Sequence, residues 1–316
     1  MTTRKTILFG FLFSVGLACN TAYKGEENTQ AKERVTLNII AFDDKDHVVG
    51  DLTSKDFQVM DEGKPQPVAF FRHDEHQAPV VILFDLLNES LGAQGYSTDQ
   101  IIRALERAES SDSIYFYLLT KEGNVRALRA LPKRKDQVDE SSGAWTAQIR
   151  PLLEAAMNSV RAGRQDYINP IPTTNRVIAA LGEGMAAIPD RKYILWVSHG
   201  IEQVYRDNGQ LRVDYSPKVT QFARTLENEG ITLNSVDLGN SFSVTSTFEE
   251  YANVTGGKVY SKDFEKALSQ TIAASHSRYI IQYDAPRSDG KLHKIRVTST
   301  RKGVHLQVKQ EYVANP

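Results

Sequence analysis

The spacing of apolar residues near the start of the chain body has a period of two. After residue 33, short segments alternate apolar and polar positions: RVTLNIIAFDD, DFQVMDE and PVAFFRH. Turn-forming residues separate them, first at Lys45-Asp46 and then at Gly63 and Pro65. This alternation is typical of strands with one buried face. It predicts a small antiparallel β-module over residues 34–78.

From residue 79 to about 275 the pattern changes, and apolar runs alternate with segments of helical period. The expected strands are VVILFDL, SIYFYLL, KYILWVS, ITLNSVDL and KVYS. The expected helices start at Ser97 or Thr98, at Pro151, at Asn175, at Ser216-Pro217, at Phe248 and at Ser261, the last as a cap. Such alternation predicts an α/β domain with a doubly wound, mostly parallel sheet and helices on both faces.

After residue 276 the alternation of period two returns. SRYIIQYD, KLHKIRVTST and GVHLQVKQEYV surround an Asp289-Gly290 turn and predict a hairpin and meander. Neither end of the chain alone has enough strands to bury a core. We therefore expect residues 276–316 to complete the module of residues 34–78 as one small antiparallel β-sandwich.

The first 33 residues follow neither pattern. A basic start, MTTRK, precedes the apolar run ILFGFLFSVGLA, which is too short to span a membrane and has the proportions of a secretory signal over residues 1–18. Cys19 follows small residues and resembles the lipidated cysteine of bacterial lipoproteins, although Gly16 replaces the usual leucine. Residues 19–33 are polar and predict a flexible tether. We expect an exported, lipid-anchored protein of the cell envelope; the alternative is a periplasmic or secreted one.

Composition excludes several classes of function. The 316 residues carry a net charge of -1, so no global field attracts nucleic acid or an anionic membrane, and the expected membrane contact is the lipid alone. Cys19 is the only cysteine, which leaves the body without disulfides or thiol chemistry. No phosphate-binding glycine loop occurs, and export separates the protein from cytosolic ATP and NAD. We expect no organic cofactor.

Several segments resemble, in order, bacterial proteins with a von Willebrand factor A-related domain, of the kind abundant in acidobacteria. They are DLTSKDFQVMDEGKPQPVAFF, VVILFDLLNES, IPDRKYILWVSHG, VTGGKVY and RYIIQYDAPRSDGKLHKIRV. The resemblance covers nearly all of the chain after the tether. It implies an A-type domain whose ligand site lies at the carboxyl ends of the strands.

In members of this fold that bind metal, an Asp-x-Ser-x-Ser segment, a loop threonine and a later aspartate hold Mg²⁺. Here Asp85 matches the first acid, but Leu87 and Glu89 stand at the two serine positions. Thr174 is the match for the threonine, and Ser198 replaces the later aspartate. The resemblance thus implies a degenerate metal-ion-dependent adhesion site, with Asp85 and Thr174 as its remaining ligands for Mg²⁺.

The function expected from these residues is non-enzymatic docking of a protein or surface polymer through the rim of the A-type domain, without metal. The expected contact residues at the rim are Asp85, Asn88, Glu89, Thr174, Ser198 and Asp237. Two alternatives remain open: a hydrolase that uses Ser198 or a metal, and a structural subunit of an envelope assembly whose contacts lie on the β-sandwich.

Three further groups of residues have a chemical and a structural interpretation. WVSHG resembles the nucleophile turn of hydrolases, but Trp196 crowds the place of the first glycine. His73 and His76 have a spacing that can bind zinc, or they belong to a solvated linker. Late tyrosines are expected mainly in the core; exposed, they would form a recognition surface. They are Tyr251, Tyr260, Tyr279 and Tyr283.

Overall fold

The computed structural model describes residues 33–88, 98–108, 113–132, 145–162, 170–207, 210–238 and 242–314. These belong to one unit, residues 33–316. The predicted signal segment, Cys19 and almost all of the tether lie outside the described residues, as does Glu89.

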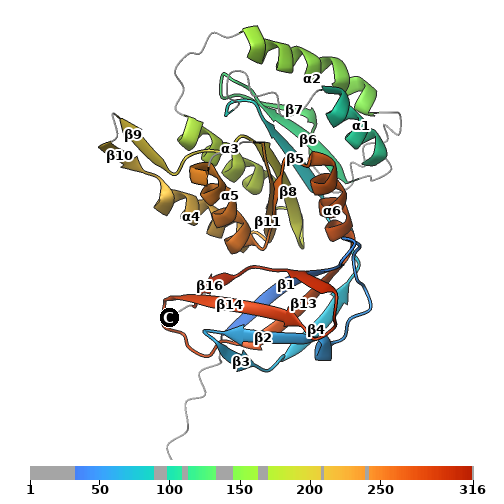
Figure 1. The fold of residues 1–316 in the computed structure, drawn as a ribbon, viewed down its shortest axis with the longest axis vertical. Coiled ribbons are helices and arrows are strands. Elements are labelled where there is room, and N and C mark those ends of the chain that lie inside the picture. Colours follow the sequence, from blue (N-terminus) through green and yellow to red (C-terminus); the bar gives the residue numbers. More distant parts are fainter. Residues whose placement is uncertain are drawn as a thin grey trace, which may run out of the picture. The chain divides into compact units, whose positions relative to one another are not determined.

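A six-stranded sheet forms the centre of the α/β part (Figure 1). Its strands are β5 (Val80–Asp85), β6 (Ile114–Leu119), β7 (Val125–Arg129), β8 (Lys192–Ser198), β11 (Ile231–Asp237) and β12 (Val259–Ser261). The spatial order is β12-β11-β8-β5-β6-β7, and only β7 runs antiparallel to its neighbour. This doubly wound order confirms the predicted mixed α/β class with a mostly parallel sheet.

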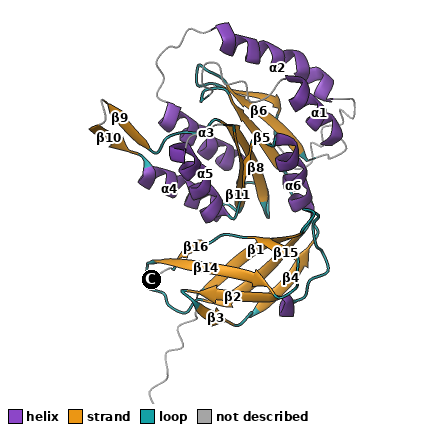
Figure 2. Ribbon diagram, in the orientation of Figure 1, coloured by secondary structure: helices purple, strands orange, loops and turns teal. Residues whose placement is uncertain are grey.

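Helices cover both faces of this sheet (Figure 2). They are α1 (Thr98–Ala108), α2 (Trp145–Ala162), α3 (Pro170–Met185), α4 (Ser216–Asn228), α5 (Phe242–Thr255) and α6 (Phe264–His276). Because side chains alternate along a strand, Ile82 and Phe84 of β5 join the core under α1, α2 and α6, while Val81 and Leu83 join the core under α3, α4 and α5. Of the helices described, none has the length and apolar character needed to cross a bilayer.

Two four-stranded antiparallel sheets combine strands from both ends of the chain. One has the order β15-β1-β13-β4 and the other β16-β14-β2-β3. Their strands are β1 (Arg34–Asp43), β2 (Phe57–Asp61, after the short helix η1, Ser54–Asp56), β3 (Lys64–Gln66), β4 (Phe70–Asp74), β13 (Arg278–Asp284), β14 (Leu292–Ser299), β15 (Val304–Gln307) and β16 (Glu311–Val313). Apolar residues of both sheets share one core cluster.

The connections at the C-terminal end differ from the prediction. β13 pairs with β1 and β4, whereas β14 pairs with β2 and β16, so the hairpin predicted across Asp289-Gly290 is wrong. The single strand expected over GVHLQVKQEYV is also divided, since β15 joins β1 and β16 joins β14. Both differences have one cause. β13, β14, β15 and β16 belong alternately to the two sheets, which pack on one shared core, so the chain crosses from one sheet to the other at each turn.

Four helix starts differ from the prediction. α3 begins at Pro170 and not at Asn175, and α5 begins at Phe242 and not at Phe248. α2 begins at Trp145, so Pro151 lies inside the helix and not in its first turn. The cap of α6 is Asp263, whose side chain accepts a hydrogen bond from the Lys266 backbone N–H at 2.9 Å, and not Ser261. The edge strand β7 and a two-stranded ribbon, β9 (Val204–Asp207) with β10 (Gln210–Asp214), were not predicted.

Candidate functional site

Three of the predicted rim residues end neighbouring strands of the parallel sheet. Asp85 ends β5, Ser198 ends β8 and Asp237 ends β11. Ser198 and Asp237 are direct partners in the strand register. Thr174 approaches the same edge from the first turns of α3. The carboxyl ends of parallel strands meet at one edge, and this is the edge at which doubly wound folds bind ligands.

Asp85 is the centre of this group, and its carboxylate accepts five hydrogen bonds. Oδ1 accepts from the backbone N–H groups of Leu87 (3.0 Å) and Asn88 (3.2 Å). Oδ2 accepts from the Asn88 side-chain amide (2.6 Å) and the Ser198 hydroxyl (2.8 Å). The fifth donor is the indole Nε1 of Trp196, at 3.1 Å. With 2% of its surface exposed, Asp85 has its hydrogen-bonding capacity met by the protein itself.

Asn88 connects Asp85 to Thr174. Its Nδ2 lies 2.6 Å from Asp85 Oδ2 and 2.7 Å from Thr174 Oγ1, and it donates to both. An amide nitrogen has two protons, so these two contacts use both of them. Thr174 itself is fully buried, whereas Asn88 is half-buried. Asn88 is therefore the member of this group that lies between the buried acid and the surface.

Trp196 is a site residue that the sequence analysis did not identify as a partner of Asp85. It is fully buried and packs against Phe248 and Tyr251, with ring centroids 4.8 and 6.1 Å away. Positions two apart on a strand share a face, so Trp196 and Ser198 lie on the same side of β8, and both donate to the Asp85 carboxylate at the end of β5. That spacing was the signal in the sequence that could have revealed it.

The charge state of Asp85 depends on two opposing effects. Burial raises the pKa of its carboxyl, and the hydrogen bonds from Asn88, Ser198 and Trp196 act in the other direction. Four of the five donors are N–H groups that can only donate, which suits an ionised carboxylate. No ion pair among the described residues includes Asp85, so burial outweighs the hydrogen bonds and the pKa of its carboxyl is raised above the usual value.

The residues present do not fit a Mg²⁺ ion. The side chain of Leu87 packs against the core under α3, α4 and α5, so it offers no ligand. Ser198 supplies a neutral hydroxyl, already directed at Asp85, where an acid is expected. The Asn88 nitrogen lies between the two oxygens that an ion would need. Among the described residues, no group of three His, Cys, Asp or Glu side chains is arranged to hold a metal.

The geometry around Ser198 pairs its hydroxyl with the buried Asp85 carboxylate and not with an imidazole. Ser198 is fully buried, donates to Asp85 and accepts from the Gly200 backbone N–H at 2.8 Å. The ring of His199 has no hydrogen-bond partner among the described residues, and burial lowers its pKa. A nucleophile needs a base within hydrogen-bond reach. In this conformation Ser198 and His199 do not form such a pair.

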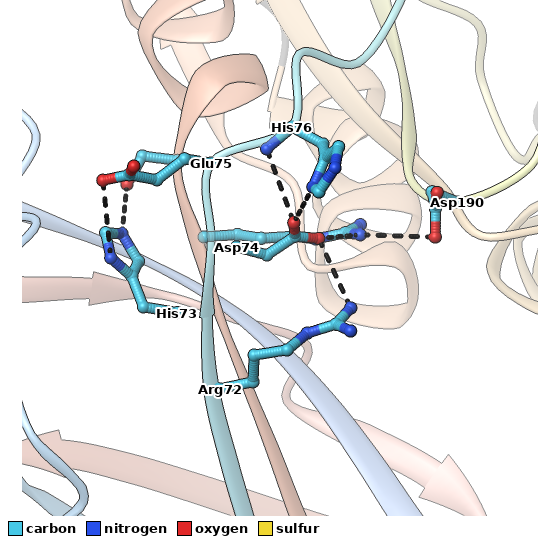
Figure 3. Close-up of polar contacts among 8 residues, drawn as sticks. Arg72, His73, Asp74, Glu75, His76 and Asp190 are labelled. Carbon is cyan, nitrogen blue, oxygen red and sulfur yellow. Dashed lines mark hydrogen bonds and ion pairs between the residues drawn. The ribbon is translucent and has the colours of Figure 1, made fainter.

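His73 and His76 bind different partners (Figure 3). His73 Nε2 lies 2.8 Å from Ser277 Oγ, and its ring stacks on Tyr279 with centroids 4.6 Å apart. His76 Nδ1 lies 2.6 Å from Asp74 Oδ1. The described side chains therefore do not bring the two imidazoles together on a shared zinc position.

The four late tyrosines are buried, as the core interpretation predicted. Their exposed fractions run from 0 to 4%. Tyr251 donates to Asn175 Oδ1 at 2.7 Å, Tyr279 to the Val49 carbonyl at 2.8 Å and Tyr283 to Asp61 Oδ2 at 2.9 Å. They do not form a recognition surface in this structure.

Comparisons with known proteins give weak structural likenesses. No protein-family profile matches the chain, and no curated protein matches it by sequence. Among solved structures, a von Willebrand factor type A protein from Catenulispora acidiphila is 10% identical over 92% of this chain and 74% of its own, with a TM-score of 0.39. The PilB minor pilin of Streptococcus sanguinis is 11% identical over 79% of this chain and 88% of its own, at 0.37.

Human Sec24c, a COPII-coat protein, is 13% identical, with a TM-score of 0.38 over 77% of this chain. The chain spans 44% of the length of Sec24c. These identities and scores are too low to place the chain in a family.

Proposed function

We propose that the protein is an exported, lipid-anchored and non-catalytic interaction module of the von Willebrand factor A-related type, with a degenerate metal site. Its docking surface is the rim at the carboxyl ends of β5, β8 and β11, and it engages a protein or surface polymer without metal. The two antiparallel sheets act as one β-sandwich that carries the α/β domain.

The observation that supports this proposal is the self-contained hydrogen bonding of Asp85. Its carboxylate accepts from Leu87, Asn88, Ser198 and Trp196, so the loop after β5 is fixed to the end of β8 without any ligand. A surface that is already ordered loses less conformational entropy when a partner binds. A rim held in this way suits docking better than chemistry.

Burial divides the predicted contact residues into two groups. Asp85, Thr174 and Ser198 are at most 2% exposed, so they support the rim from below. Asn88 is half-buried and stands above them. Exposed acids on the same edge, Glu122 after β6 and Glu202 after β8, extend the surface that a partner can touch.

Charge reversal at the rim tests the proposal. Glu122→Lys and Glu202→Lys change exposed rim positions, and Glu183→Lys is the matched control. Glu183 is also exposed, but it lies nine positions beyond Thr174 on α3, about 14 Å along the helix. With a photo-crosslinker placed at exposed position 124, in the turn after β6, of the full chain, we expect the crosslinked species to be lost in both rim variants, retained in the control and unaffected by EDTA.

A groove elsewhere on the chain favours the alternative of a structural subunit. A cavity of about 790 Å³ is lined by residues of β14 and β15 with Asn253 of α5, and its apolar members include Ile295, Val297, Leu306 and Val308. If Leu306→Lys removes the co-purifying partners of the full chain while Glu202→Lys keeps them, the contacts belong to the β-sheets and the rim proposal is wrong.

The hydrolase alternative and the lipid anchor have separate tests. Labelling of the wild type by a fluorophosphonate probe, lost in Ser198→Ala, would establish a reactive serine; we expect no labelling. Cys19→Ser is expected to move the protein from the membrane fraction to the soluble one. A wild type that is already soluble would contradict the anchor.

A further inference from the structure

We propose that the side-chain amide of Asn88 takes the place of a divalent cation between Asp85 and Thr174 and excludes an ion from these two oxygens. The inference concerns how the rim is held, and it stands whether or not the rim docks a partner. It predicts that one substitution converts the site into a metal site.

The first step is the position of the amide. Its nitrogen lies 2.6 Å from Asp85 Oδ2 and 2.7 Å from Thr174 Oγ1. An ion bound by the same two oxygens would sit about 2.1 Å from each if it were Mg²⁺. The nitrogen and the ion would therefore occupy nearly the same space, and they exclude each other.

The second step is the chemistry of the amide. A cation joins two oxygens because it is positive toward both of them. The NH₂ group of an asparagine does the same with two polarised protons, one for each oxygen. It carries no net charge, so it needs no counter-ion. Because it is bonded to the chain, it cannot dissociate as an ion can. The amide reproduces the crosslinking part of the ion's role and lacks its open coordination position.

The third step is the cooperation of neighbouring residues. The Asn88 backbone N–H also donates to Asp85 Oδ1, at 3.2 Å, so Asn88 is hydrogen-bonded to both oxygens of the Asp85 carboxylate. Ser198 and Trp196 occupy the rest of Oδ2. An incoming ion would have to displace the amide and find replacement ligands among Leu87 and Ser198, of which the first has no donor atom.

Asn88→Asp provides the test, because it exchanges the amide for a carboxylate of the same shape. Two carboxylates beside Thr174 Oγ1 repel each other without a cation and form a hard-oxygen ligand set with one. Binding of Mn²⁺ to the full chain is followed by electron paramagnetic resonance of the free ion, together with the Mn²⁺-dependent shift in melting temperature. We expect Asn88→Asp to bind one Mn²⁺ at least about tenfold more tightly than the wild type, a gain of ~1.4 kcal/mol.

Two controls separate this site from adventitious binding. Asn228→Asp makes the same charge change at an exposed position at the end of α4, and it should leave Mn²⁺ binding at the wild-type level. Asp85→Asn in the Asn88→Asp background should remove the gain. If Asn88→Asp does not fold, Asn88→Ser removes the amide without adding charge and should also bind Mn²⁺ more tightly than the wild type.

Two results would overturn the proposal. One is saturable Mn²⁺ binding by the wild type that Asp85→Asn abolishes, because the amide would then not exclude the ion. The other is the absence of any gain in folded Asn88→Asp or Asn88→Ser protein. Neither result bears on partner docking, which the rim variants and the crosslinker test separately.

Discussion

Asp74 and Arg278 face each other across the paired strands β4 and β13, and the guanidinium donates to Asp74 Oδ2 from both Nε (2.9 Å) and Nη2 (2.5 Å). Both residues are buried. The same Nη2 lies 3.8 Å from Asp190 Oδ1, in the segment that leads into β8. One guanidinium thus contacts an antiparallel sheet and the approach to the parallel sheet.

Removing the acid from this pair should be strongly destabilising. Asp74→Ala leaves the Arg278 charge buried without its main partner, and breaking a buried pair in this way costs about 3–5 kcal/mol. Urea unfolding followed by circular dichroism measures the change. Asp51→Asn, which removes an exposed partner of Arg301, is the control and should leave the midpoint unchanged. Equal midpoints for Asp74→Ala and the wild type would show that the pair does not stabilise the fold.

The same carboxylate should make stability depend on pH in the acid range. Burial alone would raise the pKa of Asp74, but hydrogen bonds from His76 and Arg278 and the charge of Arg278 bring it down to about 2. A carboxyl with a lowered folded pKa stabilises the protein above its unfolded value of 3.8, and this is lost as pH falls through 2. The wild type should lose about 2–3 kcal/mol of unfolding free energy in this way. Urea unfolding of the wild type and of Asp74→Asn between pH 5 and pH 2 should show this loss in the wild type alone.

Two glycines should respond to alanine in opposite ways. A Cβ on Gly257, between α5 and β12, would lie 1.8 Å from the Leu233 carbonyl oxygen of β11, so Gly257→Ala must displace backbone. We expect a loss of about 3 kcal/mol or more. A Cβ on Gly184, in α3, meets nothing within 4 Å, and Gly184→Ala should add about 0.5–1 kcal/mol. Urea midpoints that move in the same direction for both would contradict the packing described here.

The elements that the sequence predicted best are the strands buried on both faces. β5, β8 and β11 are buried at every position; β5 and β8 contain continuous apolar runs, whereas β11 alternates apolar residues with small polar ones. The elements it missed have no such run. β7 is mostly exposed and β9 with β10 forms a separate ribbon, so their strand character comes from pairing with neighbours and not from their own composition.

The rim was predictable in outline but not in its bonding. The predicted strand ends, together with the family resemblance, placed Asp85, Thr174 and Ser198 at one edge of the sheet, because the topology determines where the strand ends meet. The position of the Asn88 amide depends on one rotamer and on the turn after β5, and no pattern in the sequence encodes either. The missing metal ligands could therefore be counted from the sequence, but the group that replaces the ion could not be identified from it.

His293 provides a second dependence on pH, of opposite sign. It is 4% exposed, and its Nδ1 lies 3.0 Å from Asp61 and its Nε2 3.2 Å from Asp289. Tyr283 and Tyr312 donate to the other oxygen of Asp61. Burial by itself lowers the pKa of His293, but the two carboxylates outweigh it and raise the pKa above 6.5.

A histidine with a raised folded pKa stabilises the protein fully below its unfolded value, and that contribution disappears as pH rises through the folded value. The urea midpoint of the wild type should therefore fall between pH 6 and pH 9, and His293→Gln should flatten the fall. His305→Gln removes an exposed partner of Asp44 and should keep the wild-type slope. If His293→Gln keeps that slope as well, the carboxylates do not hold a charged imidazole, and the buried Asp61 must be held by its two tyrosines alone.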